Sequence, residues 1–294
     1  MSIASIALPR IFRIGGGASK QLPEVLASLG LSRPLIVTDG WLANSGRVAE
    51  LTDGLAAAGI AARVFADTVP DPTVASIDAG VAFLLEGEHD CVVGFGGGSP
   101  LDSAKAIALL GQHGGAMADY KAPHVQDAPG LPVIAIPTTA GTGSEATRFT
   151  IITDEATDEK MLCPGLAYLP IAALVDYELT FTKPRRLTAD TGIDSLTHAI
   201  EAYVSKRANP FSDGIALLAM RAIAPSIIAS RDAGGDRLFE QFGRAGSRDE
   251  PADRRAFPCP ARAVERDAAA CGDRLVGARG AHPLCRLRAG DGGR

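Results

Sequence analysis

Two side chains that could hold a metal ion stand four residues apart in the stretch 187–203, at Asp194 and His198. An α-helix turns once in about 3.6 residues, so a helical stretch would place this carboxylate and imidazole one above the other on one face. Such a pair can bind a divalent cation. The spacing alone is weak evidence, because most residues so placed only form a hydrogen bond or face solvent. Other features of the chain must support a metal site.

A glycine-rich loop leaves an apolar strand at 91–95 and leads into a helix predicted over 101–110. Its residues are Gly96, Gly97, Gly98 and Ser99. Glycines allow a ligand to approach the backbone closely, and the free N–H groups of a helix start favour an anion. The loop therefore predicts a pyrophosphate site, with Asp102 in the first turn of the helix. The spacing is not GxGxxG, so a simple tight turn is the alternative.

Two further segments could bind a nucleotide. Asp39 ends an earlier strand and could accept hydrogen bonds from the adenosine ribose, which favours NAD over NADP because a carboxylate repels a 2′-phosphate. A helix cap or turn is the alternative role for Asp39. The loop 137–145 follows a buried strand and offers hydroxyl and N–H donors to phosphate or ribose. A polar surface loop would have a similar composition.

The elements that position these residues alternate along the chain. Short apolar strands are predicted near 12–14, 35–38, 62–65, 91–95, 131–136 and 172–175, and helices near 19–29, 48–58, 74–85 and 101–110. This alternation predicts an α/β fold with a parallel sheet. From residue 184 the pattern is helical. We therefore expect an NAD(P)-binding α/β domain over 1–183 and the start of an incomplete all-helical metal-binding domain over 184–243.

Residues 244–294 differ in composition from the rest of the chain. They are rich in Arg, Ala, Gly and Pro, contain no Lys or Ile, and have no sustained helical or alternating period. This composition favours a segment translated out of frame from a GC-rich gene. A disordered basic tail is the alternative.

The overall composition excludes several classes of function. The net charge is −5 and the sequence pI about 5.6, so neither a nucleic acid nor an anionic membrane is expected as a partner. No long apolar run or secretory leader is evident, and we expect a cytoplasmic protein. The five cysteines form no CxxC pair, so neither a disulfide framework nor a zinc knuckle is indicated.

Three motifs together resemble the signatures of the iron-containing (group III) alcohol dehydrogenases. They span residues 96–105, 137–145 and 192–203, and the resemblance extends over about 5–243. It implies an N-terminal domain that binds NAD(P), an all-helical C-terminal domain, and a divalent metal in the cleft between them. It also implies oxidation of a small alcohol to an aldehyde or ketone, or the reverse, by metal-assisted hydride transfer.

The same resemblance assigns roles to individual residues. Asp39 resembles the ribose contact, Asp194 and His198 resemble two of the metal ligands, and Lys160 resembles a lysine beside the cofactor. The pyrophosphate loop and further cofactor contacts correspond to Gly96, Gly97, Gly98, Ser99, Asp102, Thr138, Thr139 and Ser144. The implied metal is Fe²⁺, with Zn²⁺ or Mn²⁺ as alternatives because mixed N and O ligands bind several metals.

The chain departs from the family at the two remaining metal ligands, which are histidines on later helices. Of the five histidines, His89, His113 and His124 belong to the first domain, and His282 lacks the family context. Two ligands do not complete a usual catalytic site, so we expect impaired activity. The alternatives are a non-catalytic NAD-binding remnant and a metal-independent enzyme resembling maleylacetate reductases.

Two expectations concern association. A helix over 214–228 would lose packing partners in an incomplete domain and expose apolar side chains, among them Ile215, Leu218, Ala219 and Ile223. A paired N-terminal strand near Phe12 is compatible with a homodimer.

Overall fold

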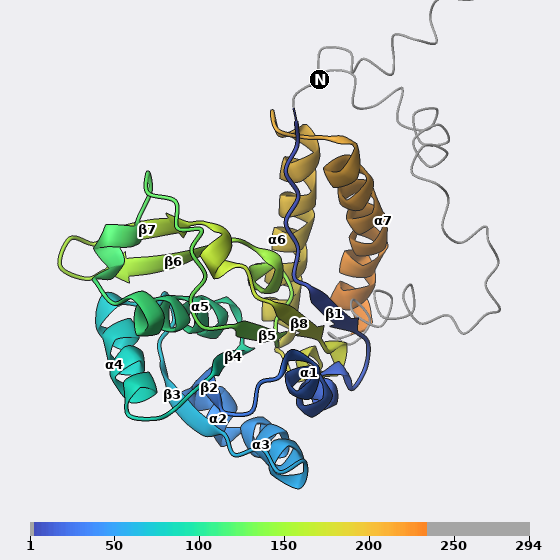
Figure 1. Cartoon of the computed structure of the whole chain (residues 1–294). Coiled ribbons are helices and arrows are strands. Elements are labelled where there is room, and N and C mark those ends of the chain that lie inside the picture. Colours follow the sequence, from blue (N-terminus) through green and yellow to red (C-terminus); the bar gives the residue numbers. More distant parts are fainter. Residues whose placement is uncertain (1–2, 234–294) are drawn as a thin grey trace, which may run out of the picture.

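A parallel sheet forms the centre of the computed structural model, which describes residues 3–233 (Figure 1). Its six strands lie in the order β1-β8-β5-β4-β2-β3, and every neighbouring pair is parallel. The strands are β1 (Ile11–Ile14), β2 (Pro34–Asp39), β3 (Arg63–Thr68), β4 (Cys91–Gly96), β5 (Val133–Pro137) and β8 (Ala172–Val175). The predicted α/β fold with a parallel sheet is confirmed.

Helices cover both faces of this sheet, which explains why its strands are continuous apolar runs rather than alternating ones. The strand β2 illustrates the two sides. Ile36 packs into a core cluster with residues of α1 (Leu22–Leu29) and α3 (Arg47–Ala57). Leu35 and Val37 pack into the other cluster, with α4 (Val74–Leu85) and α5 (Gly98–His113).

Several predicted boundaries need correction. The helix α5 begins at Gly98, not at 101, so Gly98 and Ser99 form its first turn and Asp102 lies beyond that turn. Pro100 is tolerated there because the first N–H groups of a helix have no partner inside it. The short helix α2 (Gly40–Asn44) and the antiparallel hairpin of β6 (Phe149–Asp154) and β7 (Glu159–Pro164) were not predicted.

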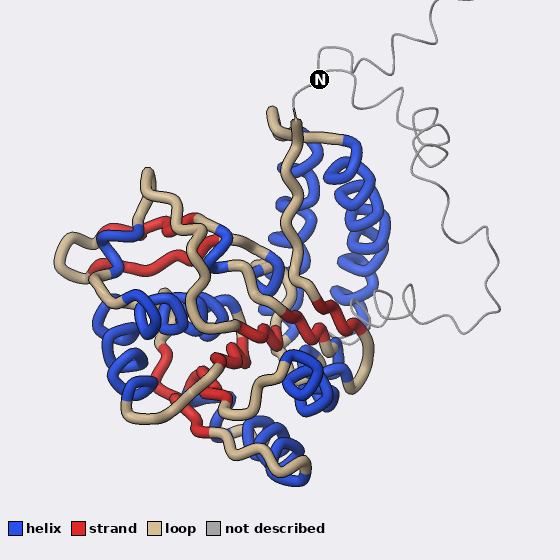
Figure 2. The backbone as a smooth tube through the Cα atoms, viewed as in Figure 1, coloured by secondary structure: helices blue, strands red, loops and turns tan. Residues whose placement is uncertain are grey.

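Two long helices follow the sheet domain and pack against each other (Figures 1 and 2). They are α6 (Arg185–Val204) and α7 (Pro210–Ala233). The expected apolar exposure is confirmed at Ile215 and Leu218, which are 52% and 67% exposed, whereas Ile223 is buried. The predicted tail over 244–294 lies outside the described residues.

Candidate active site

The candidate residues of the first domain gather where the central strands end. Gly96 at the end of β4 is paired in register with Pro137 at the end of β5, and Asp39 ends the neighbouring strand β2. The carboxyl edge of a parallel sheet is the usual ligand-binding edge of such folds. The structure therefore brings the predicted glycine loop, Asp39 and the loop 137–145 to the same edge.

Two glycines of the glycine loop lie so close to neighbouring protein atoms that a side chain would not fit there. Gly96 has φ +155°, and a Cβ there would lie 2.6 Å from Pro100 Cγ. A Cβ on Gly98 would lie 2.9 Å from Thr142 Cγ2. No side chain caps the N-terminus of α5, whose N-cap residue is Gly97. The N–H groups at this helix start have no side-chain cap and suit an anion, and pyrophosphate binding here stays a prediction.

Asp39 has the capping role that sequence analysis kept as an alternative. Its Oδ1 accepts a hydrogen bond of 2.8 Å from the Leu42 N–H and caps α2. Its Oδ2 faces the glycine loop, 3.6 Å from where a Gly96 Cβ would be. The cap holds the carboxylate at the sheet edge, and its contact with a ribose stays a prediction.

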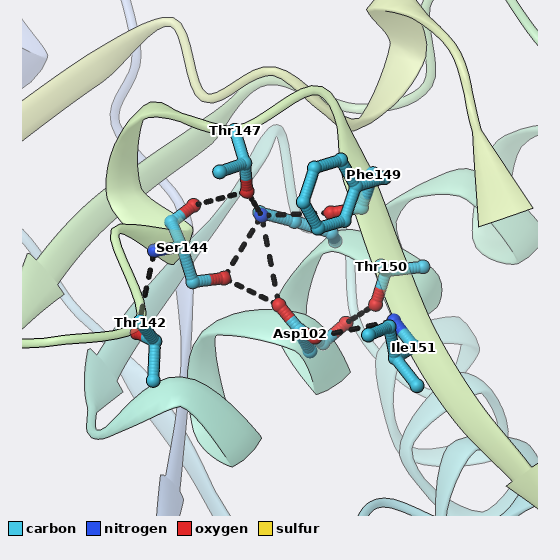
Figure 3. A network of polar contacts seen from close by, with 8 residues as sticks. Asp102, Thr142, Ser144, Thr147, Phe149, Thr150 and Ile151 are labelled. Atoms are coloured by element: carbon cyan, nitrogen blue, oxygen red, sulfur yellow. Dashed lines mark hydrogen bonds and ion pairs between the residues drawn. The ribbon is translucent and has the colours of Figure 1, made fainter. Parts of the chain in front are cut away.

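Asp102 and Ser144 belong to a buried polar network (Figure 3). The Ser144 hydroxyl donates to Asp102 Oδ1, and the Ile151 N–H donates to Asp102 Oδ2 at 3.1 Å. This network fixes the loop 137–145 and the strand β6 to α5. Direct contact of Asp102 or Ser144 with a cofactor stays a prediction.

The centre of this network is Lys105, to which the sequence analysis gave no role. Its side chain is fully buried, and Nζ donates to Ser144 Oγ, Thr147 Oγ1 and the Phe149 carbonyl at 2.9–3.0 Å. Nζ also lies 3.6 Å from Asp102 Oδ1. Burial lowers the pKa of Lys105 to about 8, although Asp102 opposes this shift. Burial likewise raises the pKa of the nearby Glu145 carboxyl.

Thr138 and Thr139 begin the second loop. The buried Thr138 donates its N–H to the Gly96 carbonyl at 2.8 Å, which joins the two loops. Thr139 lines a small hollow between this loop and the start of the helical domain. The hollow is lined by Thr139, Ala140, Thr180, Lys183, Leu187, Thr188 and Thr191.

Lys183 in this hollow was also missed by the sequence analysis. Its Nζ lies 4.5 Å from the centroid of the Trp41 ring, two residues beyond Asp39. Burial lowers the pKa of Lys183, and the charge of Asp39 opposes the shift. No spacing rule joins residues 39, 41 and 183, so only the fold reveals this group.

Lys160 lies at the rim of this edge. It is on β7, and its Nζ forms an ion pair of 3.0 Å with Asp71 in the turn after β3. Its side chain is 61% exposed. A contact with the cofactor stays a prediction.

Asp194 and His198 lie together on α6, as the helical spacing predicts. His198 Nε2 is 3.5 Å from Asp194 Oδ1, and His198 Nδ1 is 3.7 Å from Glu201 Oε2. Both partners of the predicted pair are about half exposed. Carboxylate oxygen and imidazole nitrogen suit Fe²⁺, Zn²⁺ or Mn²⁺. Across residues 3–233, no group of three or more His, Cys, Asp or Glu side chains could hold a metal.

The loop 137–145 connects the two parts of the site. A Cβ on Gly141 would lie 2.9 Å from Asp194 Oδ2 and 3.2 Å from the Thr191 carbonyl. The same loop touches Gly98 through Thr142. The loop 137–145 therefore contacts both the glycine loop at the sheet edge and the helix that carries Asp194 and His198.

Comparison with known protein families shows which family the chain belongs to. Residues 9–177 match the iron-containing alcohol dehydrogenase family, and residues 188–242 match the C-terminal domain of the Fe-containing alcohol dehydrogenase family. The chain belongs to the iron-containing alcohol dehydrogenase family, as the three motifs predicted. Its members are oxidoreductases that act on CH–OH groups, and NAD and Fe²⁺ are cofactors that fit the family.

Individual relatives support this assignment. The chain is 42% identical over 240 residues to long-chain-alcohol dehydrogenase 1 of Geobacillus thermodenitrificans, which covers 81% of this chain and 60% of that protein. It is 41% identical over 216 residues to the NAD-dependent methanol dehydrogenase of Bacillus methanolicus, covering 74% of this chain and 57% of that one. The chain thus spans about three fifths of the length of these curated relatives.

A solved structure shows the same fold with a nucleotide. The sulfoacetaldehyde reductase of Bifidobacterium kashiwanohense in complex with NAD⁺ has 31% sequence identity and a TM-score of 0.77. The match covers 83% of this chain and 65% of that one. Among the described residues, none of the helices is sufficiently long and apolar to cross a membrane.

Proposed function

We propose that this chain is an NAD-dependent, iron-type alcohol dehydrogenase whose activity is impaired because its metal site is incomplete. One observation carries the proposal. The loop 137–145 touches the glycine loop through Thr142 and the candidate ligand Asp194 through Gly141. A nucleotide at the glycine loop and a metal at Asp194 would therefore both be bound next to this one loop, and direct hydride transfer between cofactor and substrate requires such proximity.

The chain's own residues have distinct tasks in this proposal. The N-terminus of α5 binds the pyrophosphate, and Asp39 orients the adenosine ribose. Thr138, Thr139 and Lys160 are proposed as further contacts to the nucleotide. Asp194 and His198 would hold a divalent metal, and such a metal stabilises the charge on an alcohol or carbonyl oxygen when it is bound. The family supports a small alcohol, aldehyde or ketone as substrate.

The proposed impairment rests on the number of ligands. Residues 3–233 supply two neighbouring candidates and no third that could complete the site. Catalytic sites usually have at least three protein ligands, so a two-ligand site should bind metal weakly. The alternatives remain a non-catalytic NAD-binding remnant and a metal-independent reductase like the maleylacetate reductases. We also propose a cytoplasmic protein with no nucleic-acid or membrane partner, able to form a homodimer.

The test is metal content and NAD-linked alcohol oxidation of the purified 294-residue chain, prepared anaerobically with Fe²⁺. We expect binding of NADH, metal well below one ion per chain, and slow oxidation that a chelator abolishes. His198→Ala should remove the remaining metal. His124→Ala, which changes an exposed histidine of the sheet domain, is the matched control and should change nothing.

The outcomes separate the proposals. NADH binding without metal or turnover would favour the non-catalytic remnant. Turnover that survives chelation would favour the metal-independent reductase. One firmly held metal per chain with rapid turnover would refute the impairment. Equal metal content in His198→Ala and the parent would show that the pair on α6 is not a metal site.

A further inference from the structure

Three side chains from two distant parts of the sequence lie near one another beside the proposed adenosine site. Asp39 ends β2 and Trp41 follows it in α2, whereas Lys183 precedes α6 and lines the hollow together with Thr139. About 140 residues separate Trp41 from Lys183 in the sequence, so only the fold brings the two side chains together. Lys183 thus lies near Trp41 and within electrostatic reach of Asp39, although it is far from both in the sequence.

The indole of Trp41 fixes the position of the ammonium group. Lys183 Nζ lies 4.5 Å from the ring centroid, a distance at which a cation is attracted to the face of the ring. Trp41 is 58% exposed, so the ring is not part of the protein core and remains accessible at the sheet edge. The pair places a positive charge next to the carboxylate that is proposed to face the ribose.

The charges at this point have opposite effects on a 2′-phosphate. Asp39 alone would repel the phosphate that distinguishes NADP(H) from NAD(H). A lysine ammonium attracts phosphate as a point charge, and a partly desolvated one does so more strongly than an exposed one. Burial lowers the pKa of Lys183, and the negative charge of Asp39 opposes this shift. The preference between NADP(H) and NAD(H) should thus depend on both Asp39 and Lys183.

We propose that Lys183 is a specificity-determining residue that binds a phosphate on the 2′-position of the adenosine ribose, so that the site accepts NADPH as well as NADH. The inference rests on the proposed nucleotide site. A merely structural role of Lys183 on Trp41 would affect the two nucleotides equally. A role at the 2′-position would affect only the one that carries the phosphate.

The experiment measures the dissociation constants of NADH and NADPH for the full chain by the change in nucleotide fluorescence. Lys183→Met keeps the apolar stem and removes the charge, Lys183→Arg keeps the charge, and Lys206→Met changes an exposed lysine between α6 and α7 as control. We expect Lys183→Met to weaken NADPH binding about tenfold and NADH binding less than about twofold. Lys183→Arg and Lys206→Met should keep the parent's ratio of NADPH to NADH dissociation constants.

Three results would overturn the inference. Equal losses for both nucleotides in Lys183→Met would assign Lys183 a structural role. An unchanged ratio, with NADH bound normally, would refute this inference and leave the proposed function intact. A parent chain that binds neither nucleotide would refute the nucleotide site itself, and the role of Lys183 with it.

Discussion

At the scale of single residues, Asp39 caps a helix and still turns one carboxylate oxygen toward the glycine loop, so the cap does not exclude the predicted ribose contact. One carboxylate oxygen caps α2 through the Leu42 N–H, and the other faces the glycine loop. The cap explains why the side chain is held at the sheet edge. If the ribose binds here as proposed, this fixed negative charge should repel a 2′-phosphate.

Removing this charge should shift the cofactor preference. We expect Asp39→Gly to improve NADPH binding relative to NADH by about tenfold, because the repulsion is lost and Lys183 is unopposed. Glycine is an acceptable N-cap, so the cost in stability should be a few tenths of a kcal/mol. The measurement is the ratio of the two dissociation constants. Asp39→Asn keeps the cap without the charge and should shift the preference in the same direction as Asp39→Gly. If neither variant changes the ratio of the two dissociation constants, Asp39 does not contact the ribose.

At the scale of elements, the loop 137–145 depends on a glycine that touches the helical unit. Gly141 has φ +130°, and a Cβ would lie 2.9 Å from Asp194 Oδ2. We expect Gly141→Ala to displace the Asp194 carboxylate and lower the metal content further. The matched control is Gly143→Ala, which also has a positive φ (+62°) but open space around the Cβ.

Metal analysis and NADH titration of both glycine variants provide the test. Both substitutions strain the backbone, since L side chains rarely adopt a positive φ. The metal content of Gly141→Ala should fall below that of Gly143→Ala, because only the first substitution reaches Asp194. Equal metal content in the two would mean that the loop does not position Asp194.

The network around Lys105 predicts a particular dependence of stability on pH. Its pKa falls from 10.5 to about 8 on folding, so between these values the unfolded chain binds more protons than the folded one. Stability should therefore rise as pH increases from about 8 to about 10.5, by at most about 3 kcal/mol from this residue.

The test compares the free energy of unfolding of the parent and Lys105→Met over this pH range. Cys91, Cys163 and Tyr168 have raised pKa values, which makes them oppose the rise. Both proteins share these groups, so their effects cancel in the difference. The free energy of unfolding of the parent should increase relative to that of the variant as pH rises. A constant difference between the two would refute the lowered pKa of Lys105.

Much of the element order follows from the sequence because both sheet faces are buried. Continuous apolar runs such as 35–38 and 91–95 have no other stable location in a chain of this kind. The hairpin β6–β7 was not predicted, because Phe149 and Ile151 are partly exposed while Ile152 is buried against α5. Its pattern therefore depends on a neighbouring helix rather than on the strand itself.

Some residues of the candidate site could likewise be found from the sequence, and others only from the fold. Asp194 and His198 share one helix, and the glycine loop is contiguous, so local spacing was sufficient to find them. Lys105 and Lys183 act through partners about 40 and 140 residues away in the sequence. No local pattern encodes such contacts, and the fold had to be known first.

At the scale of the whole molecule, the helical unit presents apolar surface that the sheet domain does not cover. Ile193 and Ile200 on α6 and Ile215 and Leu218 on α7 are each between 45% and 67% exposed. Apolar side chains gathered on one small unit promote association between molecules. This surface should therefore limit the solubility of the 294-residue chain.

A charge placed on this surface should reduce association without unfolding the protein. Leu218→Glu changes a side chain that is 67% exposed, so the free energy of unfolding should change by less than about 0.5 kcal/mol. Light scattering at increasing concentration should show less association than in the parent. Ile223→Glu, on the same helix but 3% exposed, should instead destabilise the helical unit strongly, because it buries a carboxylate. Strong destabilisation by Leu218→Glu would mean that this face of α7 is packed in solution, and unchanged scattering would mean that it does not drive association.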